Sequence, residues 1–264
     1  MKLFDDKICH LTFSHTDCID IWPAYFGEMK KYFDCGIEHF VCVDKVIDEI
    51  PSYIKPLVYT NGETYSKRLL DCLNMLSENY EYIIFDHEDM FLYDYPVSEE
   101  LEKYYKVLKS GELDHIRLIK GGSCISEPFQ DIPTLHKFNL ESKWIFSIQP
   151  SFWKIETFKE LLSKHIDDNV WDLERKGQIT VKQMELQAAY SFNAGGKRRG
   201  IYHFDNIIYP YVATAIGKGK WNYNEYKKEL GKVFELYSIN PKKRGINSFL
   251  DGVFDNFSFL KKGK

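Results

Sequence analysis

This sequence has no long apolar run and no excess of basic residues. None of its 264 residues belongs to a stretch long and apolar enough to span a bilayer. Lys and Arg number 35 against 39 Asp and Glu, a net charge of −4, so the chain carries no global basic field that would attract nucleic acid. We therefore expect neither a transmembrane helix nor a nucleic-acid partner.

Glycine-rich phosphate loops and paired cysteines are also absent. Neither GxGxxG nor GxxxxGKS/T occurs, so a bound nucleotide must be held in another way. The six cysteines show no metal-ligand spacing and mostly lie in apolar segments, which is typical of reduced thiols. Asp5, Asp6 and Lys7 precede the first apolar run, which argues against a signal peptide. These features predict a cytoplasmic protein.

What the sequence does contain is a globular composition and a regular alternation of short apolar runs with amphipathic segments. Hydrophobic residues make up 44% and charged residues 28%. Strands are expected at Ile8–Phe13, His39–Val43 and 57–60, and helices at 22–33 and Tyr65–Leu76. This alternation predicts a parallel α/β sheet over about the first hundred residues.

The second half of the sequence is less regular. The expected helices are Ser98–Ser110, 156–164, 181–192 and 225–237, and the expected strands are 115–120 and 144–149. Residues 123–142 are rich in Pro, Ser and Asp and are predicted to form a loop over a site.

The most informative stretch is YIIFDHEDMFLY at 82–93. A short apolar run, predicted to be a buried strand, ends in Asp86, Glu88 and Asp89. Ligands bind at the carboxyl ends of strands in open α/β sheets, and crowded carboxylates call for a positive partner such as a divalent metal. Residues two apart on a strand point the same way, so Asp86 and Glu88 are predicted to share a cation, with Asp89 near a sugar hydroxyl. The alternative is a solvated acidic loop or helix start.

The acid cluster and four further motifs resemble the GT-A fold of nucleotide-sugar glycosyltransferases, in particular a group of small bacterial and viral enzymes. The motifs are DCIDIW at 17–22, SKRL at 66–69, HEDMFL at 87–92, IQPSFWK at 148–154 and WDLE at 171–174. Each motif is weak alone, and the resemblance, from about residue 9 to 221, lies in their order and spacing. At His87, in the middle of the acid cluster, the group often has Gln or another residue.

The resemblance implies a Rossmann-like α/β domain with a mostly parallel central sheet flanked by helices. The domain would span residues 1–222, with a donor-binding half at about 1–122 and an acceptor half at about 123–222, followed by a helical extension at 223–264. The loop after the first strand would bind the donor nucleotide, with Ser14, His15 and Asp17 as candidates. Asp17 serves equally well as a helix cap. Arg68 would pair with the diphosphate, or it is a surface charge.

The resemblance also suggests roles in the second half. Asp172 is the favoured catalytic base and Glu174 the alternate, although both fit acids in the first turn of a helix. Trp153 and Trp171 would form walls for the acceptor sugar, or they belong to the core. His203 would join Asp86 and Glu88 as a metal ligand for Mn²⁺ or Mg²⁺, although a lone histidine is more often structural.

The sequence thus predicts a metal-dependent glycosyltransferase that moves a sugar from a nucleotide-diphosphate donor to a glycan or lipid-linked acceptor, with inversion implied by the resemblance alone. A sugar nucleotidyltransferase and a non-catalytic carbohydrate-binding protein remain alternatives. Residues 249–260 carry aromatic and aliphatic side chains before Lys261, Lys262 and Lys264. They suggest peripheral contact with the inner face of a membrane, or else a packed terminal helix.

Overall fold

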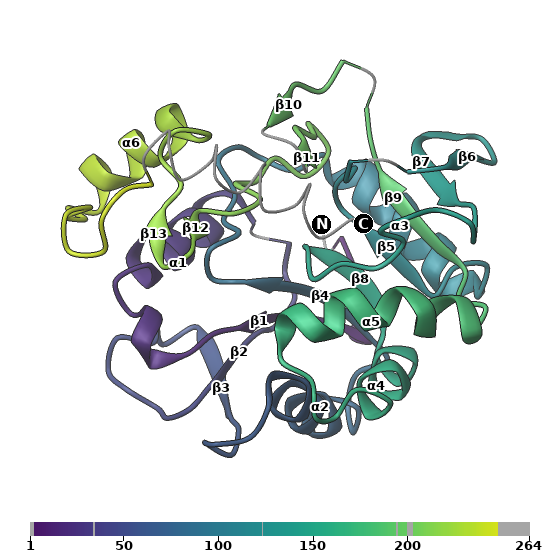
Figure 1. Ribbon diagram of the computed structural model, residues 1–264, viewed down its shortest axis with the longest axis horizontal. Helices are drawn as coiled ribbons and strands as arrows, with labels where there is room; N and C mark the ends of the chain where they lie inside the picture. The colour runs from purple at the N-terminus through teal and green to yellow at the C-terminus, as the bar shows by residue number, and fades with distance from the viewer. Residues whose placement is uncertain (1–2, 34, 123, 194, 200–202, 248–264) are drawn as a thin grey trace, which may run out of the picture.

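A computed structural model of the chain describes residues 3–33, 35–122, 124–193, 195–199 and 203–247. In this part of the chain, a mixed sheet of nine strands has the order β3-β2-β1-β4-β8-β5-β9-β7-β6 (Figure 1). The strands are β1 (Ile8–Phe13), β2 (His39–Val43), β3 (Ile54–Val58), β4 (Tyr82–His87), β5 (His115–Arg117), β6 (Ser126–Phe129), β7 (Ile132–Phe138), β8 (Ser151–Lys154) and β9 (Ala188–Ser191).

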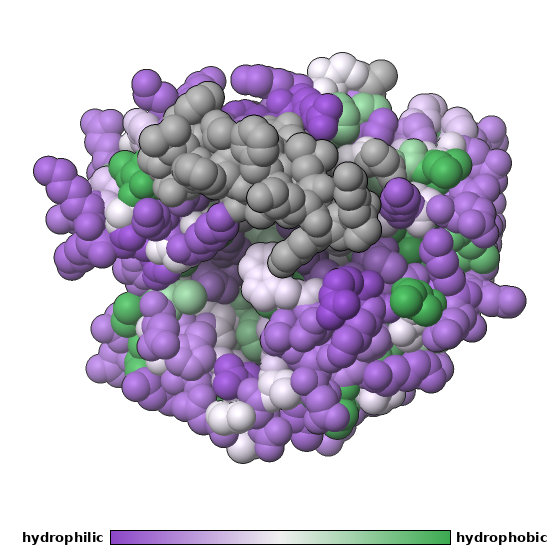
Figure 2. All heavy atoms as spheres, in the orientation of Figure 1, coloured by the Kyte–Doolittle hydropathy of each residue, from purple (hydrophilic) through white to green (hydrophobic). Residues whose placement is uncertain are grey.

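Helices cover both faces of this sheet. They are α1 (Trp22–Tyr32), α2 (Tyr65–Leu76), α3 (Ser98–Ser110), α4 (Ile155–Ser163), α5 (Val170–Gln183) and α6 (Lys227–Leu236). Figure 1 shows α2, α4 and α5 grouped below the central strands, with α1 and α6 above them. The face in Figure 2 is mostly hydrophilic with scattered hydrophobic residues, as expected for a water-exposed α/β surface. None of the helices in the described ranges has the length and apolarity that crossing a bilayer requires.

The sheet is parallel only in part. Strands β3, β2, β1 and β4 run parallel, as the sequence predicts for the first hundred residues. Strand β8 then runs antiparallel to both β4 and β5, and β7 pairs antiparallel with β9 and β6. Strands β5 and β9 pair in parallel. The α/β class is therefore confirmed, whereas the sheet as a whole is mixed rather than mostly parallel.

Several expected elements of the second half take other forms. Residues 123–142, predicted to be a loop, contain the β6–β7 hairpin. Residues 144–149 form no strand: their backbone groups bond to side chains of β5 and α5, and the next strand, β8, begins at Ser151. The predicted helix 181–192 is instead the end of α5 followed by β9, because the chain turns at Glu185, where φ is +53°.

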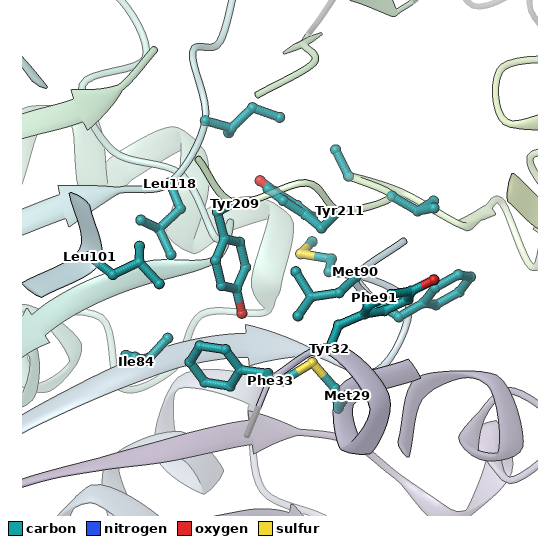
Figure 3. Packing of buried hydrophobic residues seen from close by; sticks show 14 of the residues in the cluster. Met29, Tyr32, Phe33, Ile84, Met90, Phe91, Leu101, Leu118, Tyr209 and Tyr211 are labelled. Carbon is teal, nitrogen blue, oxygen red and sulfur yellow. The ribbon is translucent and has the colours of Figure 1, made fainter. Parts of the chain in front are cut away.

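Two hydrophobic cores lie on opposite faces of the sheet. One packs the buried face of α2 and parts of α4 and α5 against the strands. The other packs α1, α3 and α6 against the opposite face. Figure 3 shows Met29 of α1 and Phe33, which follows α1, converging with Ile84 of β4 and with Tyr209. Burial of these large side chains supplies the main stabilisation of the fold.

The end of the described chain packs onto the second of these cores. Two short strands, β12 (Ile216–Gly217) and β13 (Lys220–Trp221), form a hairpin, and α6 follows. Trp221, Leu230 and Val233 all belong to the core on the α1 face. The hairpin and α6 therefore share a core with the sheet. The segment proposed for membrane contact, 249–264, lies outside the described residues.

Candidate functional site

The candidate site forms where β1 and β4 end side by side. These strands pair in parallel, with Phe13 opposite His87, so the chain segments that follow them leave the sheet together. After β1 comes a short 3-10 helix at Thr16–Cys18, and after β4 comes a turn at Glu88 and Asp89, closed by the bond from the Met90 amide to the His87 carbonyl. This is the edge at which open α/β sheets place ligands.

Asp86 lies buried behind this edge, close enough to Asp89 for its negative charge to help raise the pKa of Asp89. Its side chain is fully buried on the α1 face of the sheet, where its oxygens accept hydrogen bonds from the Tyr25 hydroxyl at 2.7 Å and lie 3.2 Å from Nε2 of His10. The alternation rule predicted that Asp86 and Glu88 would share a cation. That rule fails here because β4 ends at His87 and the backbone turns before Glu88.

Glu88 and Asp89 form the acid pair at the edge. Both are half-buried. Burial raises the pKa of Glu88 above its usual value, and polar contacts from Cys18 and Ser14 offset part of that effect. Burial, followed by the negative charge of Glu88, raises the pKa of Asp89 to about 7. Two carboxyl groups in this state are stabilised by an added positive charge.

The C-terminal part of the described chain supplies positive groups to both acids. The Ile216 amide at the start of β12 donates to Asp89 Oδ2 at 3.3 Å. The Arg244 guanidinium lies close enough to Glu88 to lower the pKa of that carboxyl, and it is itself held in an ion pair with Asp20. Residues far apart in the sequence thus meet at the acid pair.

The predicted donor residues of the first loop have distinct environments. Ser14 is buried, its hydroxyl accepting from Trp22 Nε1 at 2.8 Å and its carbonyl from the Tyr59 hydroxyl at 3.0 Å. Nδ1 of His15 accepts from the Asp17 amide, so His15 rather than Asp17 caps the 3-10 helix. The Asp17 side chain is 90% exposed and available to a ligand.

Arg68 of α2 lies near this loop through Tyr59. Its guanidinium carbon is 5.1 Å from the centre of the Tyr59 ring, and the Tyr59 hydroxyl binds the loop carbonyl of Ser14. The Nε atom of Arg68 is buried and has no hydrogen-bond partner among the described residues. Arg68 is therefore a half-buried cation beside the donor loop rather than a free surface charge.

Glu174 approaches the acid pair from the second half of the chain. Tyr65 has both Glu174 and Glu88 among the charges that raise its pKa, and its hydroxyl bonds Nε2 of His87 at 2.8 Å. Oε1 of Glu174 accepts from the Ile148 amide at 2.8 Å, and burial raises the pKa of Glu174. Glu174 and Glu88 therefore both lie within electrostatic reach of the Tyr65 hydroxyl.

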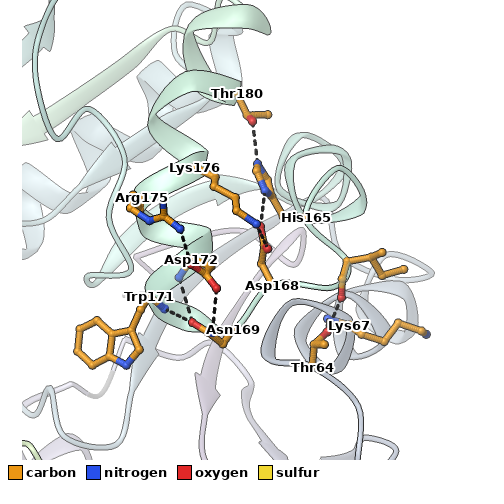
Figure 4. A network of polar contacts seen from close by, with 11 residues as sticks. Thr64, Lys67, His165, Asp168, Asn169, Trp171, Asp172, Arg175, Lys176 and Thr180 are labelled. Carbon is orange, nitrogen blue, oxygen red and sulfur yellow. Dashed lines mark hydrogen bonds and ion pairs between the residues drawn. The ribbon is translucent and has the colours of Figure 1, made fainter.

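Asp172 and Trp171 lie in the first turn of α5, next to the helix cap Asn169 (Figure 4). Asp172 accepts from Nη2 of Arg175 at 2.7 Å and from the side chain of the helix cap Asn169 at 3.0 Å. Trp171 is 76% exposed. The structure thus gives Asp172 the helix-start role weighed as the alternative to catalysis, and it leaves Trp171 open to an acceptor.

Two other predicted residues lie elsewhere. Trp153 is only 1% exposed and stacks between His115 and Phe158, because β8 is an interior strand. It therefore belongs to the core and is not accessible to an acceptor sugar. His203 lies against Gly121 near Arg117, and burial lowers its pKa to about 4. Within the described residues, no three His, Cys, Asp or Glu side chains gather as a metal-binding group, so Asp86, Glu88 and His203 do not form the predicted set.

Comparisons with known proteins add no relatives. No model of a known protein family matches the chain, and no curated protein matches it. The residues of the site are therefore the basis for assigning a function.

Sequence reasoning missed three contributors to this site: Tyr65, the Ile216 amide and Arg244. In the sequence, Tyr65 is only the first residue of the expected helix Tyr65–Leu76. Arg244 is 156 positions from Glu88, and nothing in its local sequence distinguishes it from other basic residues. A backbone amide such as that of Ile216 leaves no trace in the sequence at all. Only the resemblance motif at 17–22 pointed to Cys18 and Asp20.

Proposed function

We propose that this protein is a metal-dependent glycosyltransferase that transfers a sugar from a nucleotide-diphosphate donor to a hydroxyl acceptor, on a GT-A-like fold. The observation that carries the proposal is the half-buried pair Glu88–Asp89, with raised pKa values, at the carboxyl ends of two parallel strands. The donor loop from Ser14 to Asp17 begins at the same edge. The motif resemblance supplies the reaction class.

The donor set of the acid pair suits Mn²⁺ or Mg²⁺. These ions take oxygen ligands, and Mg²⁺ in particular is commonly held by one or two carboxylates together with substrate phosphates. Glu88 and Asp89 would hold the ion, in place of the Asp86–Glu88–His203 set suggested by the sequence. When bound, the ion supplies charge neutralisation for the departing diphosphate.

Among the chain's own groups, Glu174 fits the base better than Asp172. A base must be in reach of the acceptor hydroxyl and needs a pKa near the working pH. Burial raises the pKa of Glu174, and one of its oxygens is oriented by the Ile148 amide. Asp172 is already engaged by Arg175 and Asn169. Arg68 and Asp17 would contact the donor nucleotide, and the exposed Trp171 would contact the acceptor.

Metal-dependent nucleotide binding tests this proposal. Thermal shifts of the full chain with UDP, GDP, CDP or dTDP should require Mn²⁺, and Glu88→Gln or Asp89→Asn should abolish the Mn²⁺-dependent part. Both variants should fold, because each removes a charge that burial disfavours. Asp94→Asn, at an exposed acid five positions beyond Asp89, is the matched control and should behave like wild type.

Turnover then separates the reaction classes. Release of nucleoside diphosphate from a nucleotide sugar supports sugar transfer. Pyrophosphate release from a sugar 1-phosphate and a nucleoside triphosphate would instead assign the chain to nucleotidyl transfer. If Mn²⁺ leaves nucleotide binding unchanged in wild type and in both acid variants, the proposal that the enzyme depends on a metal is contradicted.

A further inference from the structure

Arg244 stands out because it connects three parts of the candidate site. Its Nε donates to Asp20 Oδ2 at 2.9 Å, its Nη2 pairs with the other Asp20 oxygen, and Nη2 also lies 3.5 Å from the Asp17 carbonyl. The same guanidinium interacts electrostatically with Glu88 and Cys18. Arg244 is therefore held against the donor loop by Asp20 and lies within electrostatic reach of Glu88.

The segment carrying Arg244 is firmly attached. We call residues 240–247 the C-terminal strap. The Trp221 amide donates to the Gly245 carbonyl and the Asn247 amide to the Trp221 carbonyl, both at 2.9 Å, so the strap pairs with the β12–β13 hairpin. The first residue of that hairpin, Ile216, donates its amide to Asp89. The hairpin thus places a backbone N–H donor at Asp89, and the strap places the Arg244 guanidinium near Glu88.

A fixed cation beside an acid pair acts differently on two kinds of ligand. It repels a bare divalent cation that approaches the same carboxylates. It attracts the phosphate oxygens that accompany the cation in a donor complex, and a guanidinium suits such oxygens because it presents several N–H donors in one plane. The opposite signs of these two effects make the binding of cation and phosphate interdependent.

We infer that Arg244 couples the metal to the donor: it weakens binding of a bare cation at Glu88 and Asp89 and strengthens binding of the cation together with a nucleoside diphosphate. The inference rests on the proposed function and adds to it a positioning residue and a coupling between the binding of cation and donor. Through Asp20, Arg244 also holds the loop after β1 in the place where the nucleotide would bind.

Calorimetric titration of the full chain tests this coupling with Mn²⁺ alone, and with UDP, GDP, CDP and dTDP in saturating Mn²⁺. Arg244→Gln should bind Mn²⁺ alone more tightly and the best nucleotide less tightly, each by at least about fivefold. Lys243→Gln removes the same charge from an exposed neighbour in the strap and should leave both affinities within about twofold of wild type.

The outcomes separate the inference from the proposed function. If wild type binds Mn²⁺ with a nucleotide and Arg244→Gln shifts both affinities in the same direction, or neither, Arg244 only anchors the strap and the inference is overturned. If wild type binds no nucleotide with Mn²⁺, that result contradicts the proposed function and therefore also the inference that rests on it. Arg244→Lys keeps the positive charge but lacks the planar set of N–H donors of a guanidinium. It should retain the weak binding of bare Mn²⁺ if the variant folds as wild type does.

Discussion

Asp86, Glu88 and Asp89 fill three of four consecutive positions, with His87 between the first two, yet their carboxyl groups have different surroundings. Asp86 is in the core with a tyrosine and a histidine as partners, whereas Glu88 and Asp89 lie half-buried at the edge of the sheet. The sequence identified the cluster but not this division. The division depends on the residue at which β4 gives way to a turn, and composition does not determine that residue.

The choice of base is a prediction at the scale of single residues. Glu174→Gln removes the carboxylate beside Tyr65 and keeps an oxygen for the Ile148 amide, so we expect kcat to fall by about 10² or more with little change in nucleotide affinity. Asp172→Asn should lower kcat by no more than about threefold, because Asp172 serves the start of α5.

Initial rates with saturating donor check this assignment, with nucleotide binding measured in parallel. A large loss in Asp172→Asn with little loss in Glu174→Gln would restore the assignment that the sequence favoured.

At the scale of elements, the first half of the chain was largely predictable. In the second half, α4 and α6 lie close to the expected bounds, whereas residues 123–149 and 181–192 take other forms than expected. Strands β1 and β2 and helices α2 and α3 have the predicted bounds because periodicity and burial agree there. Residues 144–149 looked like a strand because they are apolar. Their position is instead fixed by the buried Arg117, which donates to the Trp144 carbonyl at 2.8 Å, and by Gln178 and Glu174. Such side-chain contacts are tertiary and have no local signature.

A pair of helix glycines tests how α5 supports this segment. Gly177 faces Phe146 so closely that an added Cβ would lie 2.7 Å from the ring, whereas an added Cβ at Gly231 of α6 would first meet the Tyr223 hydroxyl at an ordinary 3.6 Å. Gly177→Ala should therefore destabilise the fold by about 1–3 kcal/mol through overpacking. Gly231→Ala should stabilise it by up to about 1 kcal/mol through helix propensity.

Urea denaturation of the two variants gives the free energies of unfolding. Equal stabilisation by both alanines would show that α5 does not pack tightly against Phe146, and the account of residues 144–149 would need revision.

At the scale of the whole molecule, buried histidines make stability depend on pH. Burial lowers the pKa of His39 to about 3 and that of His203 to about 4, and it lowers the pKa of His115 well below its usual value. In the unfolded chain these residues titrate near 6.5. Below that pH these histidines take up protons in the unfolded state but not in the folded state. Their contribution to stability is therefore full above about pH 6.5 and is lost as the pH drops.

The His115 side chain isolates one such contribution. Between pH 7 and pH 5, each histidine that stays neutral when folded should cost about 2 kcal/mol of unfolding free energy. His115→Phe keeps an aromatic ring beside Trp153, stacked at 3.9 Å in wild type, and removes the titration, so it should reduce the loss by about that amount. Denaturation at the two pH values measures this difference. A loss as large in His115→Phe as in wild type would show that His115 is protonated in the folded state.

The central claim is that Glu88 and Asp89 hold a cation that a donor diphosphate shares. Anomalous scattering from crystals grown with Mn²⁺ and the nucleoside diphosphate that binds best locates that ion directly. The account predicts one manganese peak at coordination distance, about 2 Å, from oxygens of Glu88 or Asp89 and of the diphosphate. A manganese ion bound elsewhere with the diphosphate, or a diphosphate bound at this edge without any ion, would contradict it.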